Sequence, residues 1–520
     1  MQVFPVDVWN IKEYGIEEWH KGFSWPVPIP EFERLRNEIE HLYLGIASES
    51  HPDVEDALWV LFSWTGGLAR FLHALLVIQR IQDAGKTIRY SPFSQDYKIL
   101  AEGEPIQRIS GKPLPPLTSW RRKIGGQIRT WQENYNYHGF DIGLYLKPHH
   151  LTAELDSIEV RQVLGHYSIS CGRRLDLIRS VLLMPHRLDR ACELPGCKES
   201  VTCFIDGLEA LALKFGLHLE KRHQERLRGL FVKGVKYVGA YIYEIRKNLS
   251  LFKRTSILVQ TLGATFNRSL CAAGKKEGFQ IVGFPHGNYM DTFKISTTSY
   301  VLKGLVDTYV VPSEGAAELS SMAVENFLHR YQKHVDIVCC RNSEYGRRSS
   351  LSRGKAISSS IEKVMIIESA LTPIYQGWPY QLDLNLRIAK LLRGYKMKAI
   401  LKKHPDRLRE AEGVYDCFYD ELLAEPFEET WDKADAYIIP HIGTTAFGVA
   451  LFTNKPIIIF EYILEYVWEQ ASELIRKRCR VIPSRFSEDG SILFDEDKLI
   501  QALQDPPEEP NDEFIDRYML

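Results

Sequence analysis

The sequence lacks the features that mark several large classes of protein. No run of about eighteen or more apolar residues, the length typical of a membrane-spanning helix, occurs among the 520 residues. The first residues, MQVFPVDVWNIKEYG, have no charged start followed by an apolar core, as a secretion signal would. The 65 Lys and Arg are balanced by 67 Asp and Glu, which argues against nucleic acid as a partner. We therefore expect a cytoplasmic protein.

Cysteine is sparse and unpatterned. The nine cysteines are scattered and odd in number, and free thiols suit a reducing compartment. The one cluster, Cys192, Cys197 and Cys203 with His186 nearby, has neither a CxxC pair nor a second pair of ligands. We expect no metal there or elsewhere in the chain.

Four common catalytic motifs are also missing. The sequence contains no GxxxxGK[ST] loop, no GxGxxG fingerprint, no HExxH pair and no GxSxG elbow. Their absence argues against a P-loop nucleotidase, a dinucleotide enzyme, a zinc protease and a serine hydrolase of the elbow type.

Apolar runs of strand length alternate with helical patterns in what remains. Residues 1–50 are rich in Trp, Pro and acidic side chains and are interpreted as an N-terminal extension. The run from Ala57 to Phe62 then predicts a buried strand, residues 63–67 a tight loop, and the following residues a helix that ends at Gly85. Gly66 and Gly67 in that loop would let a ligand approach the backbone closely.

The alternation is clearest in two later blocks. Strands are predicted at 256–261, 279–284 and 307–313, and again at 363–369, 397–405, 434–440 and 455–462. The polar segment 341–360 separates the blocks and is expected to be a linker. Strands alternating with helices favour parallel, doubly wound sheets. The fold class is therefore α/β, with Rossmann-like domains at 51–340, including a helical insertion, and at 361–520.

Polar residues gather at the ends of the predicted strands of the second block, where ligands bind in such sheets. The apolar stretch AIL is followed by KKHP, and another strand leads into PHIGTT. Cationic side chains and a helix N-terminus with free N–H groups both suit a phosphate. The residues predicted to bind this phosphate or the nucleotide that carries it are Lys403, His404, Pro405, Gly443, Thr444, Thr445 and Glu461.

Three of these stretches resemble a known family. GFQIVGFPHGNYMD is similar to the strand and HG dipeptide of capsule Kdo transferases and teichoic-acid-type polymerases. LKKHP is similar to their K-x-HP signature, which bacterial sialyltransferases share, and GTTAFGVALFTNKPIIIF to their ST-x-x-x-E-A-L-x-x-x-KP-x-I block. The resemblance, over about residues 255–465, is to GT-B glycosyltransferases that build bacterial surface polysaccharides, in which two Rossmann-like domains face a cleft.

This resemblance implies roles for the two domains. The C-terminal domain would bind a nucleotide sugar through the phosphate residues named above, and the N-terminal domain would hold the acceptor near Gly66, Gly67 and Gly287. No metal or cofactor is implied, because helix dipoles and basic side chains neutralise the leaving group. Val449 stands where the family has the Glu that holds the ribose, and Glu461 is a possible substitute.

The catalytic base stays open at this stage, with His286, Asp291 and Glu368 as the candidates. The leading hypothesis is a glycosyltransferase that moves a sugar, for instance a CMP-activated acidic sugar, from a nucleotide donor to a surface polysaccharide or a glycolipid. One alternative is a CDP-glycerol or polyol phosphotransferase of the same fold. Another is a noncatalytic GT-B-like scaffold of a polysaccharide assembly complex.

A basic stretch between the blocks suggests a further partner. Residues 221–254 contain ten Lys or Arg and two Glu, with apolar residues interleaved at near-helical spacing. This pattern is typical of an amphipathic helix on an anionic membrane surface, and also of an ordinary solvated helix. Peripheral contact with the inner face of a membrane is therefore a second expectation, in keeping with a lipid-linked acceptor.

Overall fold

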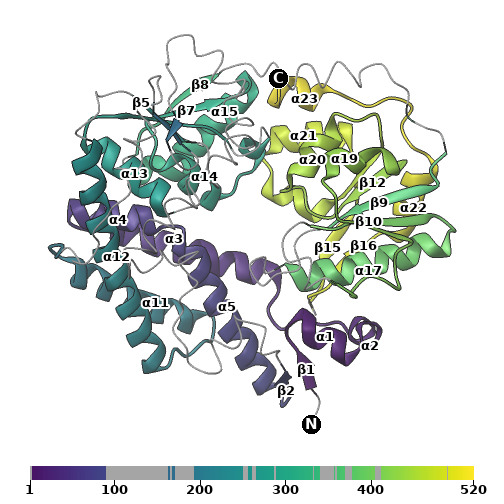
Figure 1. The fold of residues 1–520 in the computed structure, drawn as a ribbon. Helices are drawn as coiled ribbons and strands as arrows, with labels where there is room; N and C mark the ends of the chain where they lie inside the picture. The colour runs from purple at the N-terminus through teal and green to yellow at the C-terminus, as the bar shows by residue number, and fades with distance from the viewer. Residues whose placement is uncertain are drawn as a thin grey trace, which may run out of the picture.

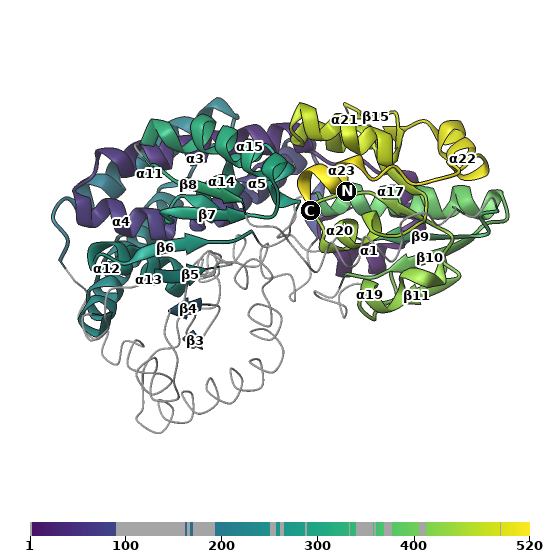
Figure 2. The same cartoon turned by 90° about the horizontal axis from the view of Figure 1, so that it is seen from above.

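The structure is a computed structural model of the 520-residue chain. The residues that it describes are 3–89, 162–163, 167–169, 193–249, 256–259, 265–285, 289–331, 333–339, 357, 360–368, 377–404, 412–488 and 490–520. Two six-stranded sheets, each flanked by helices, dominate these residues (Figures 1 and 2). The predicted α/β class is thereby confirmed.

The first sheet has the order β3-β4-β5-β6-β7-β8. Strands β5 to β8 run parallel, whereas β3 and β4 join as an antiparallel edge. Its strands are β3 (Gln162–Val163), β4 (Tyr167–Ile169), β5 (Ser256–Val259), β6 (Gln280–Gly283), β7 (Thr308–Val311) and β8 (Asp336–Cys339). The helices that connect the parallel strands include α13 (Thr265–Lys276), α14 (Ser296–Lys303) and α15 (Glu314–Ala323).

The second sheet is entirely parallel, with the order β11-β10-β9-β12-β13-β14. In chain order this is 3-2-1-4-5-6, the arrangement of a doubly wound Rossmann-type sheet. Successive strands are added in one direction from the first strand to the third, and in the opposite direction from the fourth strand to the sixth. Its strands are β9 (Lys363–Ile367), β10 (Lys398–Lys402), β11 (Glu421–Leu423), β12 (Ala436–Ile439), β13 (Ile457–Phe460) and β14 (Arg480–Ile482). Strands β12 and β13 are buried along their whole length, because helices cover both faces of such a sheet.

The helices of this second half are α17 (Trp378–Gly394), α19 (Phe427–Thr430), α20 (Thr445–Leu451), α21 (Glu469–Arg478), α22 (Glu496–Gln504) and α23 (Glu513–Tyr518). A 3₁₀ segment, η5 (Glu461–Tyr466), follows β13, and β15 (Ser484–Phe486) pairs with β16 (Ile492–Phe494) as a small ribbon. We call the described residues 29–339 the first lobe and the described residues from 360 to the C-terminus the second lobe.

A helical layer lies beneath the first sheet (Figure 1). It contains α3 (Ile29–Glu49), α4 (Pro52–Leu61), α5 (Trp64–Asp83), α11 (Cys197–Lys214) and α12 (Lys221–Leu249). Within the described residues no single helix is long and apolar enough to cross a membrane, although α4 and α5, bent by 61°, would pass together by length and composition.

The strand and loop predicted at 57–67 are wrong. Residues 57–61 are the second half of α4, and Gly66 and Gly67 lie in the first turn of α5. The run looked like a strand because α4 is buried on most of its surface among other helices, and a short apolar run does not distinguish a buried helix from a strand. Pro52 at the first position and the acidic first turn are the helix signals that identify it.

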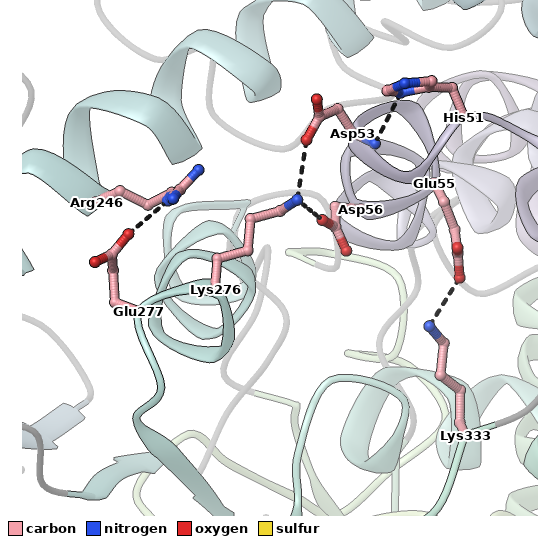
Figure 3. Close-up of polar contacts among 8 residues, drawn as sticks. All are labelled: His51, Asp53, Glu55, Asp56, Arg246, Lys276, Glu277 and Lys333. Atoms are coloured by element: carbon pink, nitrogen blue, oxygen red, sulfur yellow. Dashed lines mark hydrogen bonds and ion pairs between the residues drawn. The ribbon is translucent and has the colours of Figure 1, made fainter.

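Ion pairs attach this helical layer to the first sheet's helices (Figure 3). Lys276, the last residue of α13, lies 2.9 Å from Asp53 and 2.8 Å from Asp56 in the first turns of α4. Lys333 reaches Glu55 at 2.8 Å. Acids at the start of one helix thus face a cation at the end of another, where each complements the local helix dipole.

Residues 221–249 of the basic stretch form α12, a helix as the spacing predicts, and residues 250–254 lie outside the described residues. The apolar face of α12, with Phe231, Val235 and Ile245 fully buried, packs into the protein interior. On its polar face Arg228 pairs with Asp206 at 3.1 Å. The apolar face is therefore already covered by protein, and any contact of α12 with a membrane would be through its exposed cations.

The first part of the predicted N-terminal extension, residues 3–28, lies against the second lobe (Figure 1), whereas residues 29–49 of it form α3 in the helical layer of the first lobe. Strand β1 (Val3–Pro5) pairs in parallel with β2 (Thr87–Arg89), and helices α1 (Val8–Tyr14) and α2 (Ile16–Lys21) follow. His20 Nδ1 is 2.8 Å from Asp383 Oδ1 in α17, and the Trp25 and Trp378 rings meet edge to face at 5.9 Å. Most of the predicted linker, 341–356, lies outside the described residues.

Candidate functional site

The strand ends that the sequence singled out share one edge of the second sheet. Because β9, β10, β12 and β13 are parallel neighbours, the residues that follow them meet at their carboxyl edge. Glu368 follows β9, Lys403 and His404 follow β10, and His441 comes soon after β12. The reversal of strand order between β9 and β12 places Glu368 and the loop after Ile439 on either side of the position where such sheets bind ligands.

Glu368 is a buried carboxyl at this edge. The residue is 3% exposed, and its Oε2 accepts the backbone N–H of His404 at 3.1 Å. Its Oε1 has no hydrogen-bond partner in the described structure. Burial raises the pKa of Glu368 to about 7, although the His404 N–H, the Tyr415 hydroxyl and the neighbouring Lys403 and Lys402 oppose that rise. A carboxyl that titrates near neutral pH is suited to accept or donate a proton.

The three basic residues after the apolar part of β10 have different environments. Lys402 is buried, and its ammonium donates to the backbone oxygen of Lys403 at 2.5 Å; burial lowers the pKa of Lys402. Lys403 and His404 are half-buried at the sheet edge. Lys403 and His404 are therefore the partly exposed basic residues directly after β10, and Pro405 lies outside the described residues.

The loop at 440–444, which we call the HIGT loop, begins at Pro440 and carries His441, Ile442, Gly443 and Thr444. An added Cβ on Gly443 would lie 2.8 Å from His441 Nε2, so the imidazole packs directly on this glycine. The residue as a whole is exposed to solvent. The surrounding protein and the nearby His404 both lower the pKa of His441, which favours a neutral imidazole.

Thr444 precedes α20, but its hydroxyl makes no capping bond within the described helix. It is half-buried, and Thr445 is exposed. Because α20 has only seven residues, its dipole is small, and the hydroxyl of Thr444 is the more significant feature.

Glu461 follows β13, as predicted, and is partly exposed. Its Oε1 accepts from Arg476 Nη2 at 3.1 Å, so a ribose would compete with this ion pair. Val449 packs against the hydrophobic core from the second turn of α20.

The first lobe reaches this edge through Tyr289. Its hydroxyl donates to the backbone oxygen of Thr444, and its ring packs against Phe447, with the centroids 5.6 Å apart. Tyr289 was not among the predicted residues; its position just after the PHGN stretch was the available signal. His286 and Gly287 lie outside the described residues, so the structure does not place them.

Two predicted first-lobe features are engaged in other contacts. Asp291 is 3% exposed and its Oδ1 accepts from Lys303 Nζ at 2.8 Å. The carboxylate of Asp291 is therefore engaged in a buried ion pair. Gly66 and Gly67, predicted on a ligand-binding loop, are instead helical, and the Gly66 oxygen accepts from Arg70 Nε at 3.2 Å.

Metal ligands do not assemble among the described residues: no group of three or more His, Cys, Asp or Glu there has a metal-binding arrangement. Cys197 is buried and Cys203 exposed, whereas His186 and Cys192 lie outside the described residues. No model of a known protein family matches the chain, and no curated protein matches it.

Proposed function

We propose that the protein is a GT-B-type glycosyltransferase whose second lobe binds a nucleotide sugar at the carboxyl edge of its sheet. The observation that carries this proposal is the 3-2-1-4-5-6 strand order, with Glu368, His404 and the HIGT loop at the reversal point. In this proposal Lys403 and His404 neutralise the donor phosphates through charge-assisted hydrogen bonds. The Thr444 hydroxyl, not engaged in capping the described helix, is a further donor.

The chemistry requires a base, a leaving group and a reacting carbon. The acceptor hydroxyl gives up its proton, its oxygen bonds to the anomeric carbon, and the bond from that carbon to the phosphate oxygen breaks. Cations at the phosphate stabilise the charge that develops on the departing nucleotide. Glu368, with its raised pKa, fits the proton-handling role better than Asp291, which is held by Lys303.

The acceptor site and the location of the reaction follow from assigning the nucleotide donor to the second lobe. The acceptor, a glycan or a lipid-linked glycan, would approach from the first lobe, and the reaction would take place in the cytoplasm, at or near the inner face of the membrane. A noncatalytic scaffold of the same fold is the second candidate, since Asp291 is held in a buried ion pair and Val449 replaces the family's ribose-binding Glu.

The test of nucleotide binding is a thermal-shift panel of CMP, CDP, UDP and GDP, because a ligand that binds the native state raises its melting temperature. We expect one nucleotide to stabilise the protein and His404→Ala to weaken its binding about 10- to 100-fold, as expected for a lost charge-assisted contact. His218→Ala, an exposed first-lobe histidine, is the matched control.

An unchanged affinity in a folded His404→Ala variant would remove this residue from the site. Release of free nucleotide from a sugar donor, measured with an acceptor present, separates the enzyme from the scaffold, which would bind nucleotide without releasing product.

A further inference from the structure

The HIGT loop is held at both ends by hydrogen bonds within the second lobe, and at one end the first lobe adds another. At its start, the Pro440 oxygen accepts from the Tyr462 hydroxyl at 2.6 Å and from Gln381 Nε2 at 3.4 Å, both within the second lobe. At its other end, the Thr444 oxygen accepts from the Phe447 N–H of α20 at 2.9 Å and also from the hydroxyl of Tyr289 in the first lobe. The conformation of the loop therefore depends in part on the position of the first lobe.

Tyr289 is fitted closely to the second lobe. The residue is only 3% exposed, and an added Cβ on Gly448 would lie 2.6 Å from its Cε1. Any larger residue at Gly448 would push the ring away, because real Cβ atoms do not approach other atoms so closely. Glycine in the middle of a helix costs stability. The close contact with the Tyr289 ring is a physical reason for a glycine at position 448 despite that cost.

The residues after Tyr289 continue the contact between the lobes. Phe293 forms an antiparallel bridge with Val467. The Lys294 N–H donates to the Tyr466 oxygen at 3.0 Å, and the Trp468 N–H donates to the Thr292 oxygen at 2.9 Å. These backbone bonds hold the segment that carries Tyr289 against the second lobe. They therefore keep the Tyr289 hydroxyl within reach of Thr444.

We propose that Tyr289 is a positioning residue, which sets the conformation of the HIGT loop from the opposite lobe and so prepares the loop for its ligand. The peptide that joins Thr444 to Thr445 is planar, so fixing the Thr444 oxygen also fixes the orientation of the Thr445 N–H. Because the ligand of the loop is the nucleotide donor, this part of the inference rests on the proposed function.

The reciprocal effect follows from thermodynamic linkage. If contact with Tyr289 favours the binding-competent loop, then a ligand on the loop strengthens the contact between lobes by the same factor. Donor binding would thereby stabilise the contact made by the segment that carries Tyr289. This segment directly follows the PHGN stretch of the first lobe.

The first experiment needs no ligand. Hydrogen exchange of peptides covering 441–450 is compared in the wild type, Tyr289→Phe and Gly448→Ala, with Tyr309→Phe as control. Tyr309 is a buried first-lobe tyrosine whose hydroxyl has no partner in the described structure. We expect exchange about 3- to 10-fold faster in the first two variants, as for one lost hydrogen bond, and unchanged in Tyr309→Phe. Unchanged exchange in Tyr289→Phe would overturn the inference.

The second experiment uses the nucleotide that stabilises the wild type in the CMP, CDP, UDP and GDP panel. Tyr289→Phe should weaken its binding about 3- to 10-fold while leaving the melting temperature of the free protein nearly unchanged, a combination that a purely structural role would not produce. If no nucleotide binds the wild type, the proposed function fails while the exchange result still decides the positioning role. Equal nucleotide affinity in the wild type and Tyr289→Phe would contradict the ligand part of the inference.

Discussion

Replacing Glu368 with Gln should make the protein more stable at neutral pH, and the gain should disappear in acid. Burial raises the pKa of Glu368 from 4.5 to about 7. Below pH 4.5 the carboxyl is protonated in both the folded and the unfolded chain and does not affect stability through its charge. As the pH rises from 4.5 toward 7, the unfolded chain loses this proton while the folded chain keeps it, so the free energy of unfolding falls.

The size of the effect follows from the same values. A pKa raised by this amount corresponds to about 3 kcal/mol, accumulated at roughly 1.4 kcal/mol for each pH unit. Gln is nearly isosteric, keeps an oxygen to accept the His404 N–H, and has no charge to desolvate. We therefore expect Glu368→Gln to gain up to about 3 kcal/mol relative to the wild type between pH 5 and pH 8.

Urea unfolding of both proteins across that pH range measures the difference, and taking the difference cancels titrations that the two share. Glu513→Gln is the control: Glu513 lies on the surface, where a hydrogen bond from Lys477 lowers its pKa, so its difference curve should be flat above pH 5. A flat curve for Glu368→Gln as well would refute the argument that this carboxyl is held protonated by burial.

Three further predictions concern other parts of the chain. Asp291→Asn should cost about 3–5 kcal/mol in urea unfolding, because it leaves Lys303 as a buried, unpaired cation; loss of catalysis at unchanged stability would show that Asp291 acts as a catalytic group. Gly66→Ala should raise the free energy of unfolding by about 0.5–1 kcal/mol, since no described atom lies within 4 Å of the added Cβ; a loss of acceptor binding would restore the ligand-loop interpretation. If the protein sediments with anionic liposomes at low salt, replacing the exposed Arg226 and Lys233 with Gln should weaken the binding and salt should abolish it, as screening requires; salt-resistant sedimentation would indicate apolar insertion, which the buried face of α12 argues against.

The second lobe was predictable from sequence because each of its strands is a short apolar run bounded by turn residues. The KVMII, KAILK and KPIIIF runs appear as strands close to where they were expected. Parallel strands buried on both faces produce continuous apolar runs, and the helices between them show their own period. The polar residues at their carboxyl ends then lie close together, because neighbouring parallel strands end at the same edge of the sheet.

The helical layer was harder to predict for the opposite reason. A helix buried among other helices loses the polar stripe that reveals its period, so the run at 57–62 had the composition of a strand. The Asp291 ion pair and the Tyr289 contact could not be predicted from the sequence either. Both depend on partners, Lys303 and Thr444, whose proximity arises only from tertiary packing.

The docking of the N-terminal extension on the second lobe has a consequence for biosynthesis. His20 and Asp383, whose side chains form a buried hydrogen bond, are 363 residues apart in the chain. At roughly 5–20 residues per second, a ribosome needs roughly 20–70 s to make the partner after the first residues have emerged. Throughout that interval Trp25, buried in the finished protein, lacks the Trp378 ring that packs against it. A segment made later thus completes the burial of one made earlier.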